Sequence, residues 1–147
     1  MRRTALLDVN LLVALFDPEH VHHEPSHRWF GAHKSGGWAT CPLTENGLIR
    51  ILSNPTYSRA PERPAGLAER LRRFRASGHH VFWPDDISLC DTRVFRADLA
   101  VGHRQLTDVY LLALARAHGG RLATFDRSIP LDAVVGAKAD HLAVIEA

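Results

Sequence analysis

Four acidic residues stand at the points where short apolar runs of the chain change into segments with helical periodicity. Asp8 and Asp126 directly follow an apolar run. Glu45 and Asp108 lie near the start of a helix-like segment. Short apolar runs without alternation are typical of strands that are covered on both faces of a parallel sheet. Ligands bind beyond the carboxyl ends of such strands, so we expect the four acids at one edge of the sheet.

The hydrophobic pattern predicts strands that alternate with helices along the whole chain. The expected strands cover residues 4–7, 38–41, 81–83, 122–125 and 142–145. The expected helices cover residues 10–16, 25–33, 42–53, 65–76, 91–101 and 108–118, with Thr107 as the N-cap of the last one. Alternation of this kind requires parallel strands joined by crossover helices. We therefore predict one domain over residues 1–147, with an α/β fold, a three-layer α/β/α sandwich and a five-stranded, mostly parallel sheet.

The composition is that of a globular protein without a membrane span. The 147 residues are 46% hydrophobic and 23% charged, and acidic residues interrupt the apolar stretch near the amino terminus that a signal peptide would need. No apolar segment approaches the roughly 20 residues that cross a bilayer. Cys41 and Cys90 have no zinc-ligand spacing around them. Together these features predict a cytoplasmic protein in a reducing compartment.

Arginine dominates the basic residues. The net charge is only +2, but 16 of the 18 basic residues are arginine, and six of these lie between residues 59 and 75. The planar guanidinium group can donate two hydrogen bonds to a phosphate at once. A solvated helix face explains the same run without any nucleic acid. The arginines therefore support a nucleic-acid-binding function without establishing it.

Carboxylates that meet at one sheet edge need a cation. Two unit charges about 4 Å apart repel by roughly 4 kcal/mol at an effective dielectric constant near 20. Such a cluster therefore either takes up protons or binds a metal, and oxygen ligands favour Mg²⁺ or Mn²⁺ over zinc. Taken singly, each acid also has a structural explanation as a helix cap, a first-turn charge or a turn residue. The shared position of all four favours a common site.

Each acid lies within a short sequence motif. The motifs are LLDVNLL at 6–12, Thr44-Glu45, TDVYLLALA at 107–115 and LATFDR at 122–127. In sequence and in order they resemble the acidic motifs of PIN-domain ribonucleases, and more narrowly those of VapC-type toxins of bacterial type II toxin–antitoxin systems. The resemblance extends from about residue 4 to the end of the chain and is weakest between residues 55 and 106.

This resemblance implies a set of site residues and a cofactor. The acids that it makes catalytic and metal-binding are Asp8, Glu45, Asp108 and Asp126. The neighbouring polar residues that it places against these ligands or against the RNA are Asn10, Thr107 and Arg127. It also implies one or two Mg²⁺ or Mn²⁺ ions per active site, which make hydroxide available and stabilise the leaving oxygen while a carboxylate accepts or orients the proton.

The implied function is that of a metal-dependent endoribonuclease, a hydrolase of phosphodiester bonds in structured RNA such as tRNA or rRNA. Single strands and loops of RNA can splay into a cleft of this kind. The chain would act as the toxin of a toxin–antitoxin pair. Its implied partners are a VapB-type antitoxin, which lays a helix or an extended tail into a groove of the toxin, and a second copy of the chain in a homodimer that assembles further with the antitoxin.

Other functions are compatible with parts of the sequence. HEPSH at residues 23–27 matches the HExxH pattern of zinc metalloproteases, but Pro25 belongs in a first helical turn, which would leave His23 outside the helix and separate the two imidazoles. A phosphoacceptor signalling domain also gathers carboxylates above a parallel sheet, yet it needs adjacent early acids and a late lysine, and Lys34 and Lys138 are poorly placed. A metal-free binding module would not need acids at all four positions.

Overall fold

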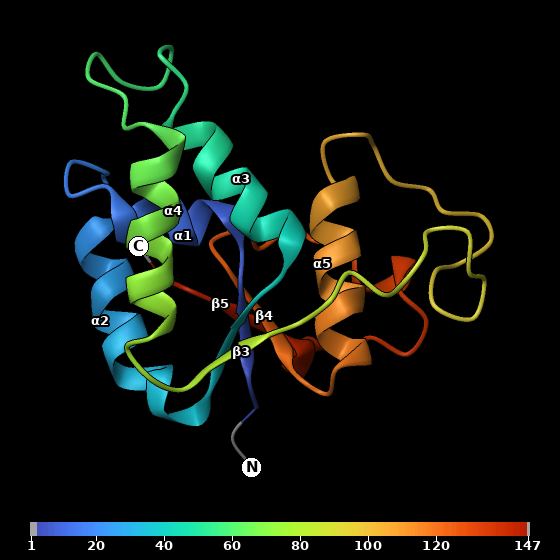
Figure 1. Cartoon of the computed structure of the whole chain (residues 1–147). Coiled ribbons are helices and arrows are strands. Elements are labelled where there is room, and N and C mark those ends of the chain that lie inside the picture. Colours follow the sequence, from blue (N-terminus) through green and yellow to red (C-terminus); the bar gives the residue numbers. More distant parts are fainter. Residues whose placement is uncertain (1–2, 147) are drawn as a thin grey trace.

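A five-stranded parallel sheet forms the centre of the molecule (Figure 1). The computed structural model describes residues 3–146. The strands are β1 (Ala5–Leu7), β2 (Trp38–Thr40), β3 (His80–Phe82), β4 (Arg121–Thr124) and β5 (Leu142–Val144). Their order in the sheet is β3-β2-β1-β4-β5, and every neighbouring pair is parallel. The central strand β1 therefore ends between the carboxyl ends of β2 and β4.

Helices cover both faces of this sheet. They are α1 (Val9–Phe16), α2 (His23–His33), α3 (Pro42–Leu52), α4 (Pro64–Arg75) and α5 (Leu106–Ala117), with short 3-10 helices at Lys34–Gly36, Leu131–Ala133 and Ala139–His141. The first four α-helices pack on one face and α5 packs on the other (Figure 1). The predicted three-layer α/β sandwich is thus confirmed. Within residues 3–146, no helix combines the length and the apolar character needed to cross a membrane.

The central strand separates two apolar cores. Ala5 and Leu7 pack against residues of the first four α-helices, whereas Leu6 packs against α5. All three side chains are buried. Because helices cover both faces, this strand shows no alternation of apolar and polar residues.

The helix predicted for residues 91–101 is wrong. The segment forms turns, and its backbone bonds to a stretch near the carboxyl end of the chain. Arg96 donates its backbone N–H to the carbonyl of Ala133 at 3.1 Å, and Phe95 pairs with Val134 in an isolated antiparallel bridge. Phe95 is buried in the core that α5 shares with the sheet. These tertiary contacts take up backbone groups that a helix would have used internally.

Two helix starts also differ from the prediction. α5 begins at Leu106 with Gln105 at its N-cap, so Thr107 lies exposed inside the first turn and does not cap the helix. α2 begins at His23, two residues earlier than expected, and this places Pro25 within its first turn. Both helices form where they were predicted, and only their first residues differ. Hydrophobic periodicity predicts the existence of a helix more reliably than the residues at which it begins and ends.

Candidate functional site

Asp8 is the most deeply buried of the predicted site residues, with 4% of its surface exposed. It follows β1 and caps α1, since its Oδ1 accepts a hydrogen bond from the backbone N–H of Val9 at 2.7 Å. Its Oδ2 accepts from the hydroxyl of Thr124, also at 2.7 Å. Burial raises the pKa of Asp8 above its ordinary value, although both hydrogen bonds oppose this effect. Asp8 is therefore a firmly held carboxyl group in a desolvated position.

Asp108 and Asp126 lie close enough to Asp8 for their charges to interact. Asp108 is in the first turn of α5, and Asp126 follows β4 after one intervening residue. Burial, together with the negative charges of Asp8 and Asp126, raises the pKa of Asp108 to about 7. We call these three residues the aspartate cluster. Their charges repel one another, and near neutral pH Asp108 relieves part of this repulsion by keeping a proton.

A tight turn holds Asp126. Its Oδ1 accepts hydrogen bonds from the backbone N–H and from the hydroxyl of Ser128, each at 2.7 Å. These bonds lower the pKa of Asp126. The backbone N–H of Asp126 donates to the Thr124 hydroxyl oxygen at 3.1 Å. Thr124 therefore links two members of the aspartate cluster, because the same hydroxyl donates to Asp8.

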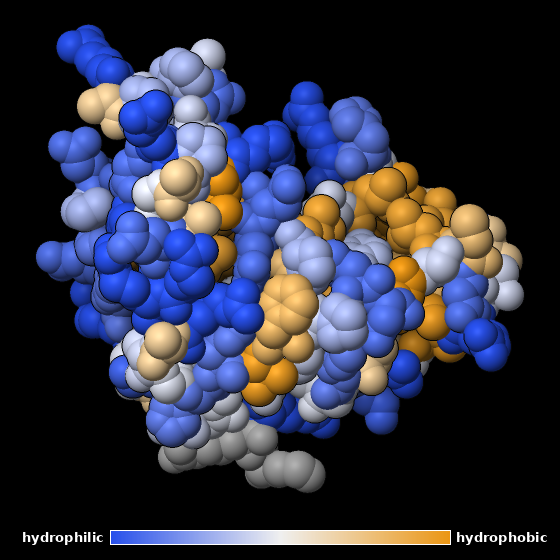
Figure 2. Space-filling model, viewed as in Figure 1, coloured by the Kyte–Doolittle hydropathy of each residue, from blue (hydrophilic) through white to orange (hydrophobic). Residues whose placement is uncertain are grey.

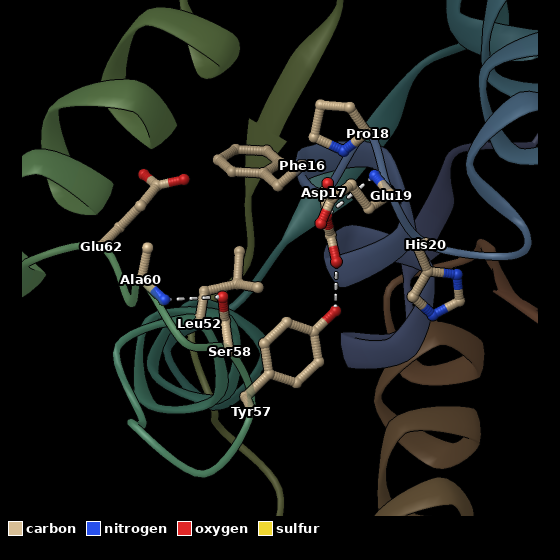
Figure 3. A pocket seen from close by; sticks show the side chains of 10 residues that line it. All are labelled: Phe16, Asp17, Pro18, Glu19, His20, Leu52, Tyr57, Ser58, Ala60 and Glu62. Carbon is tan, nitrogen blue, oxygen red and sulfur yellow. Dashed lines mark hydrogen bonds between the residues drawn. The ribbon is translucent and has the colours of Figure 1, made fainter.

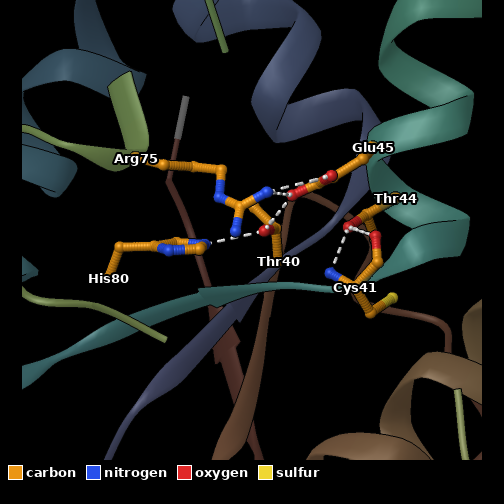
Figure 4. Close-up of polar contacts among 6 residues, drawn as sticks. All are labelled: Thr40, Cys41, Thr44, Glu45, Arg75 and His80. Carbon is orange, nitrogen blue, oxygen red and sulfur yellow. Dashed lines mark hydrogen bonds and ion pairs between the residues drawn. The ribbon is translucent and has the colours of Figure 1, made fainter. Parts of the chain in front are cut away.

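Glu45 lies in the first turn of α3, and its carboxylate contacts Thr40 and Arg75 (Figure 4). Its Oε2 accepts from the hydroxyl of Thr40 at 2.7 Å and from Nη1 of Arg75 at 3.1 Å. Nη1 also lies 3.5 Å from Oε1. The Glu45 side chain is 18% exposed. Arg75 thus compensates the charge of Glu45, in contrast to the aspartates.

His80 supports this arrangement through Thr40. Nε2 of His80 lies 2.7 Å from the Thr40 hydroxyl oxygen. Thr40 has one hydrogen to donate and gives it to the Glu45 carboxylate, which can only accept, so Nε2 of His80 carries the hydrogen of the other bond. Burial, with the charge of Arg75, lowers the pKa of His80 to about 4, and the imidazole is neutral at pH 7. A chain of hydrogen bonds therefore runs from His80 to Glu45.

The three polar residues predicted beside the acids are all exposed. Asn10 lies in the first turn of α1 and Thr107 in the first turn of α5. Arg127 follows Asp126 in the chain and forms an ion pair with Glu146 at 2.9 Å. Each one lies within two residues of a member of the aspartate cluster, where solvent can reach it.

The carboxylate oxygens of the site have the chemistry that Mg²⁺ and Mn²⁺ prefer. Burial is the largest cause of the raised pKa of Asp108, and the repulsion from Asp8 and Asp126 that adds to it is of the kind that a divalent cation relieves. Among residues 3–146, no three His, Cys, Asp or Glu side chains are grouped closely enough to hold a metal ion. The chemistry of these oxygen ligands therefore suits such an ion, but their side chains are too widely spaced to bind one as they stand. Carboxylates of the aspartate cluster would have to turn toward it, and Glu45 would have to leave Arg75.

The HExxH match does not form a zinc site. His23 and His27 lie with their ring centres 4.4 Å apart, which corrects the expectation that Pro25 would separate them. Each ring instead bonds to a carbonyl at the end of α1. Nδ1 of His23 lies 2.7 Å from the Ala14 oxygen, and Nε2 of His27 lies 2.9 Å from the Leu15 oxygen. The histidines thus satisfy carbonyls that have no partner within their own helix.

Comparison with protein families decides the class of the chain. The family model described as PIN domain matches residues 5–135. The chain belongs to the PIN-domain family. The match includes the segment between residues 55 and 106, where the sequence motifs were weakest.

Curated relatives place this PIN domain among the VapC ribonucleases. Ribonuclease VapC44 of Mycobacterium tuberculosis is 44% identical over 141 residues, which are 96% of this chain and 99% of that protein. Ribonuclease VapC39 of the same organism is 44% identical over 133 residues, 90% of this chain and 96% of that protein. Ribonuclease VapC38 is 48% identical over 125 residues, 85% and 86% of the two chains. This homology confirms the predicted family, a VapC-type PIN-domain ribonuclease.

Sequence reasoning missed the residues that support the acids. Thr40 and Thr124 are the last residues of β2 and β4, and both are buried. A threonine that ends an otherwise apolar strand is a signal that would have identified them. Arg75 and His80 offered no comparable signal, because their approach to Glu45 depends on how distant elements of the PIN domain pack.

Proposed function

We propose that this PIN domain is a metal-dependent endoribonuclease and the toxin of a toxin–antitoxin pair. Asp8, Asp108 and Asp126 hold one or two Mg²⁺ or Mn²⁺ ions, and Glu45 is the fourth acid. The observation that carries the proposal is the approach of Asp8, Asp108 and Asp126 to one another from separate elements of the fold, where burial together with the repulsion from the other two aspartates raises the pKa of Asp108 to about 7. Such repulsion weakens the metal-free fold, whereas a bound cation would offset it. PIN domains typically use Mg²⁺, which agrees with an all-oxygen donor set.

The carboxyl groups of the three aspartates differ in how they are held and in how readily they take up a proton. Asp8 is the fixed carboxylate, since burial and two hydrogen bonds restrict it. Asp126 is held at Oδ1 by Ser128 and also shares a side-chain hydrogen bond with Asp108. Asp108 holds a proton near neutral pH in the metal-free chain and would lose it to a bound cation, after which its carboxylate could orient the attacking water. When bound, the ion would lower the pKa of a coordinated water and offset charge on the phosphodiester.

The proposed substrate is structured RNA such as tRNA or rRNA. Asn10, Thr107 and Arg127 are exposed beside the aspartate cluster and offer donors to phosphate oxygens. Arg127 pairs with Glu146 at the surface, with 67% and 83% of the two side chains exposed. Pairs this exposed contribute little to stability, so Arg127 can exchange Glu146 for a phosphate.

A VapB-type antitoxin is the partner that VapC homology implies. A hollow of about 690 Å³ at the end of α1 suits a segment of such a partner (Figure 3). Phe16 and Leu52 give it apolar walls. Asp17, which accepts a hydrogen bond from the Tyr57 hydroxyl at 2.6 Å, and Glu62 add carboxylates. Apolar walls with acidic groups favour a helix or tail that carries both apolar and basic residues.

The proposal includes a homodimer. Figure 2 shows hydrophobic residues gathered on the side of the molecule where α5 and the segment before it lie. Leu43, Leu89, Leu106 and Tyr110 line a cavity of about 290 Å³ there. Leu43 and Leu89 are 38% and 39% exposed. An exposed apolar patch of this kind supports contact with a second copy of the chain.

Incubation of the purified protein with tRNA and with rRNA, in separate reactions, tests the nuclease. We expect discrete fragments from one of these RNAs with Mg²⁺ or Mn²⁺ and none with EDTA. Cleavage that persists in EDTA would contradict the metal requirement. Formation of an acyl phosphate from a small phosphodonor, without RNA cleavage, would favour a phosphoacceptor domain instead. Addition of a VapB-type antitoxin that binds the protein should suppress cleavage.

A further inference from the structure

Arg75 contacts Glu45 in a way that leaves little room for another cation. Nη1 of Arg75 lies 3.1 Å from Oε2 of Glu45 and 3.5 Å from Oε1. Oε2 also accepts the hydroxyl hydrogen of Thr40 at 2.7 Å, so both of its lone pairs are used. A divalent cation can therefore reach Glu45 only if one of these bonds breaks or if the ion binds beside a guanidinium charge.

Other contacts hold Arg75 near the site. Its guanidinium carbon lies 5.0 Å from the centre of the Phe82 ring, a distance typical of a cation–π contact. Arg75 is the last residue of α4, where the helix dipole favours a positive charge. The Arg75 side chain is 35% exposed. It can thus leave Glu45 without being forced into the core, and the Phe82 ring remains as a support.

We propose that Arg75 is an internal counter-ion that competes with the divalent cation for Glu45. This inference rests on the proposed function, since it needs an ion at the site. In the metal-free protein, Arg75 neutralises Glu45 and holds it apart from the aspartate cluster. The ion gains Glu45 as a ligand without an opposing guanidinium charge beside it only after Arg75 has moved. The ion pair therefore raises the metal concentration at which the site fills, and Arg75 acts through the position of Glu45.

Calorimetric titration with Mn²⁺ in the absence of RNA tests this role. Arg75→Gln removes the positive charge and should bind Mn²⁺ about tenfold more tightly than the wild type, a change of about 1.4 kcal/mol. Arg75→Lys keeps a positive charge on a long side chain and should stay within about threefold of the wild-type affinity. Circular dichroism verifies that each variant is folded. If Arg75→Gln does not fold, Arg75→Met, which keeps an apolar stem against Phe82, takes its place with the same expected tightening.

Two further changes show whether the effect passes through Glu45. In a Glu45→Gln background, Arg75→Gln should no longer tighten Mn²⁺ binding, because no carboxylate remains to be released. This double-mutant cycle isolates the coupling between the two residues. Arg72→Gln is the matched control, since it removes an exposed charge from the same helix. It should leave the Mn²⁺ affinity unchanged.

The outcomes separate this inference from the proposed function. The inference would be overturned if Arg75→Gln tightened Mn²⁺ binding equally with Glu45 and with Gln at position 45. It would also be overturned if Arg72→Gln tightened Mn²⁺ binding. Either result would mean a general effect of charge. Weaker binding by a folded Arg75→Gln would also overturn it, because Arg75 would then orient Glu45 as a ligand. Absence of Mn²⁺ binding by both the wild type and Arg75→Gln would contradict the proposed function itself.

Discussion

Among the residues of the site, Asp108 has the environment that suits a carboxylate least. It is partly buried, and two further aspartates act on it. Asp126 differs, because hydrogen bonds from Ser128 lower its pKa. Glu45 differs again, because Arg75 compensates its charge. Four acids that look equivalent in the sequence therefore have distinct electrostatic roles, and their substitutions should have distinct effects.

Asp108→Asn should stabilise the metal-free protein at alkaline pH. The pKa of Asp108 is about 7 in the folded chain and 3.8 ordinarily. Between these values the folded state binds more protons than the unfolded state, so stability falls as the pH rises through this window. The asparagine variant should exceed the wild type by roughly 2 kcal/mol at pH 8, after allowance for partial exposure, and should lose this advantage at pH 4. Urea unfolding in EDTA measures both values, and a difference independent of pH would contradict the raised pKa.

Asp8→Asn should remove RNA cleavage and leave the fold intact. Asparagine also serves as an N-cap, so the bond to the Val9 amide can persist, but the charge that binds a cation is lost. We expect cleavage to fall by about 100-fold or more. Fragment analysis on gels measures this loss, with circular dichroism as the test of folding. Asp98→Asn, an exposed substitution on a loop, is the control and should cleave as the wild type does.

At the scale of elements, the close packing of α1 on α3 positions the start of both helices. Gly47 of α3 faces Val9 of α1, and a Cβ at position 47 would come 2.9 Å and 3.1 Å from the two Val9 methyl carbons. Val9 follows Asp8 directly, and Glu45 precedes Gly47 by two residues. This contact therefore lies beside two of the proposed site residues.

Gly47→Ala and Gly66→Ala form a matched pair that tests this packing. Both glycines lie in helices, but a Cβ at position 66 would meet nothing within 4 Å. Alanine favours a helix by up to about 1 kcal/mol over glycine, so Gly66→Ala should be stabilising. Gly47→Ala should be destabilising by about 1–3 kcal/mol, because the stiff Val9 side chain has to shift. Urea unfolding midpoints measure both changes, and stabilisation by Gly47→Ala would show that Val9 yields easily.

For the whole molecule, metal binding and folding should be linked. An ion that binds only the folded chain stabilises it by about 2.7 kcal/mol at a concentration 100 times Kd. Mn²⁺ should therefore raise the melting temperature, and more at pH 8 than at pH 5, because Asp108 must lose its proton to bind a cation. Differential scanning fluorimetry measures these shifts. The same shift in Asp8→Asn would place the ion outside the aspartate cluster.

The sequence predicted the architecture well and the polar contacts incompletely. Buried runs such as Leu122–Ala123 predict strands because apolar and polar residues do not alternate in them. The helical spacing of its buried leucines predicts α5. Residues 91–101 also contain apolar residues, yet they form turns, because their backbone bonds to the segment around Ala133. Local periodicity carries no information about such a competing partner, so this helix was predicted in error.

The order of strands and helices and the placement of Asp8 and Asp126 after parallel strands were determined by the sequence itself. Hydrophobic periodicity and the rules of parallel topology act over short stretches of chain, and a single sequence displays them. Only the tertiary structure decided which charged side chains come into contact. Glu45 and Arg75 are 30 residues apart on different helices, and their ion pair depends on how α4 and β3 pack against α3 and β2. Electrostatic energy depends on distance through space, which no local pattern of residues specifies.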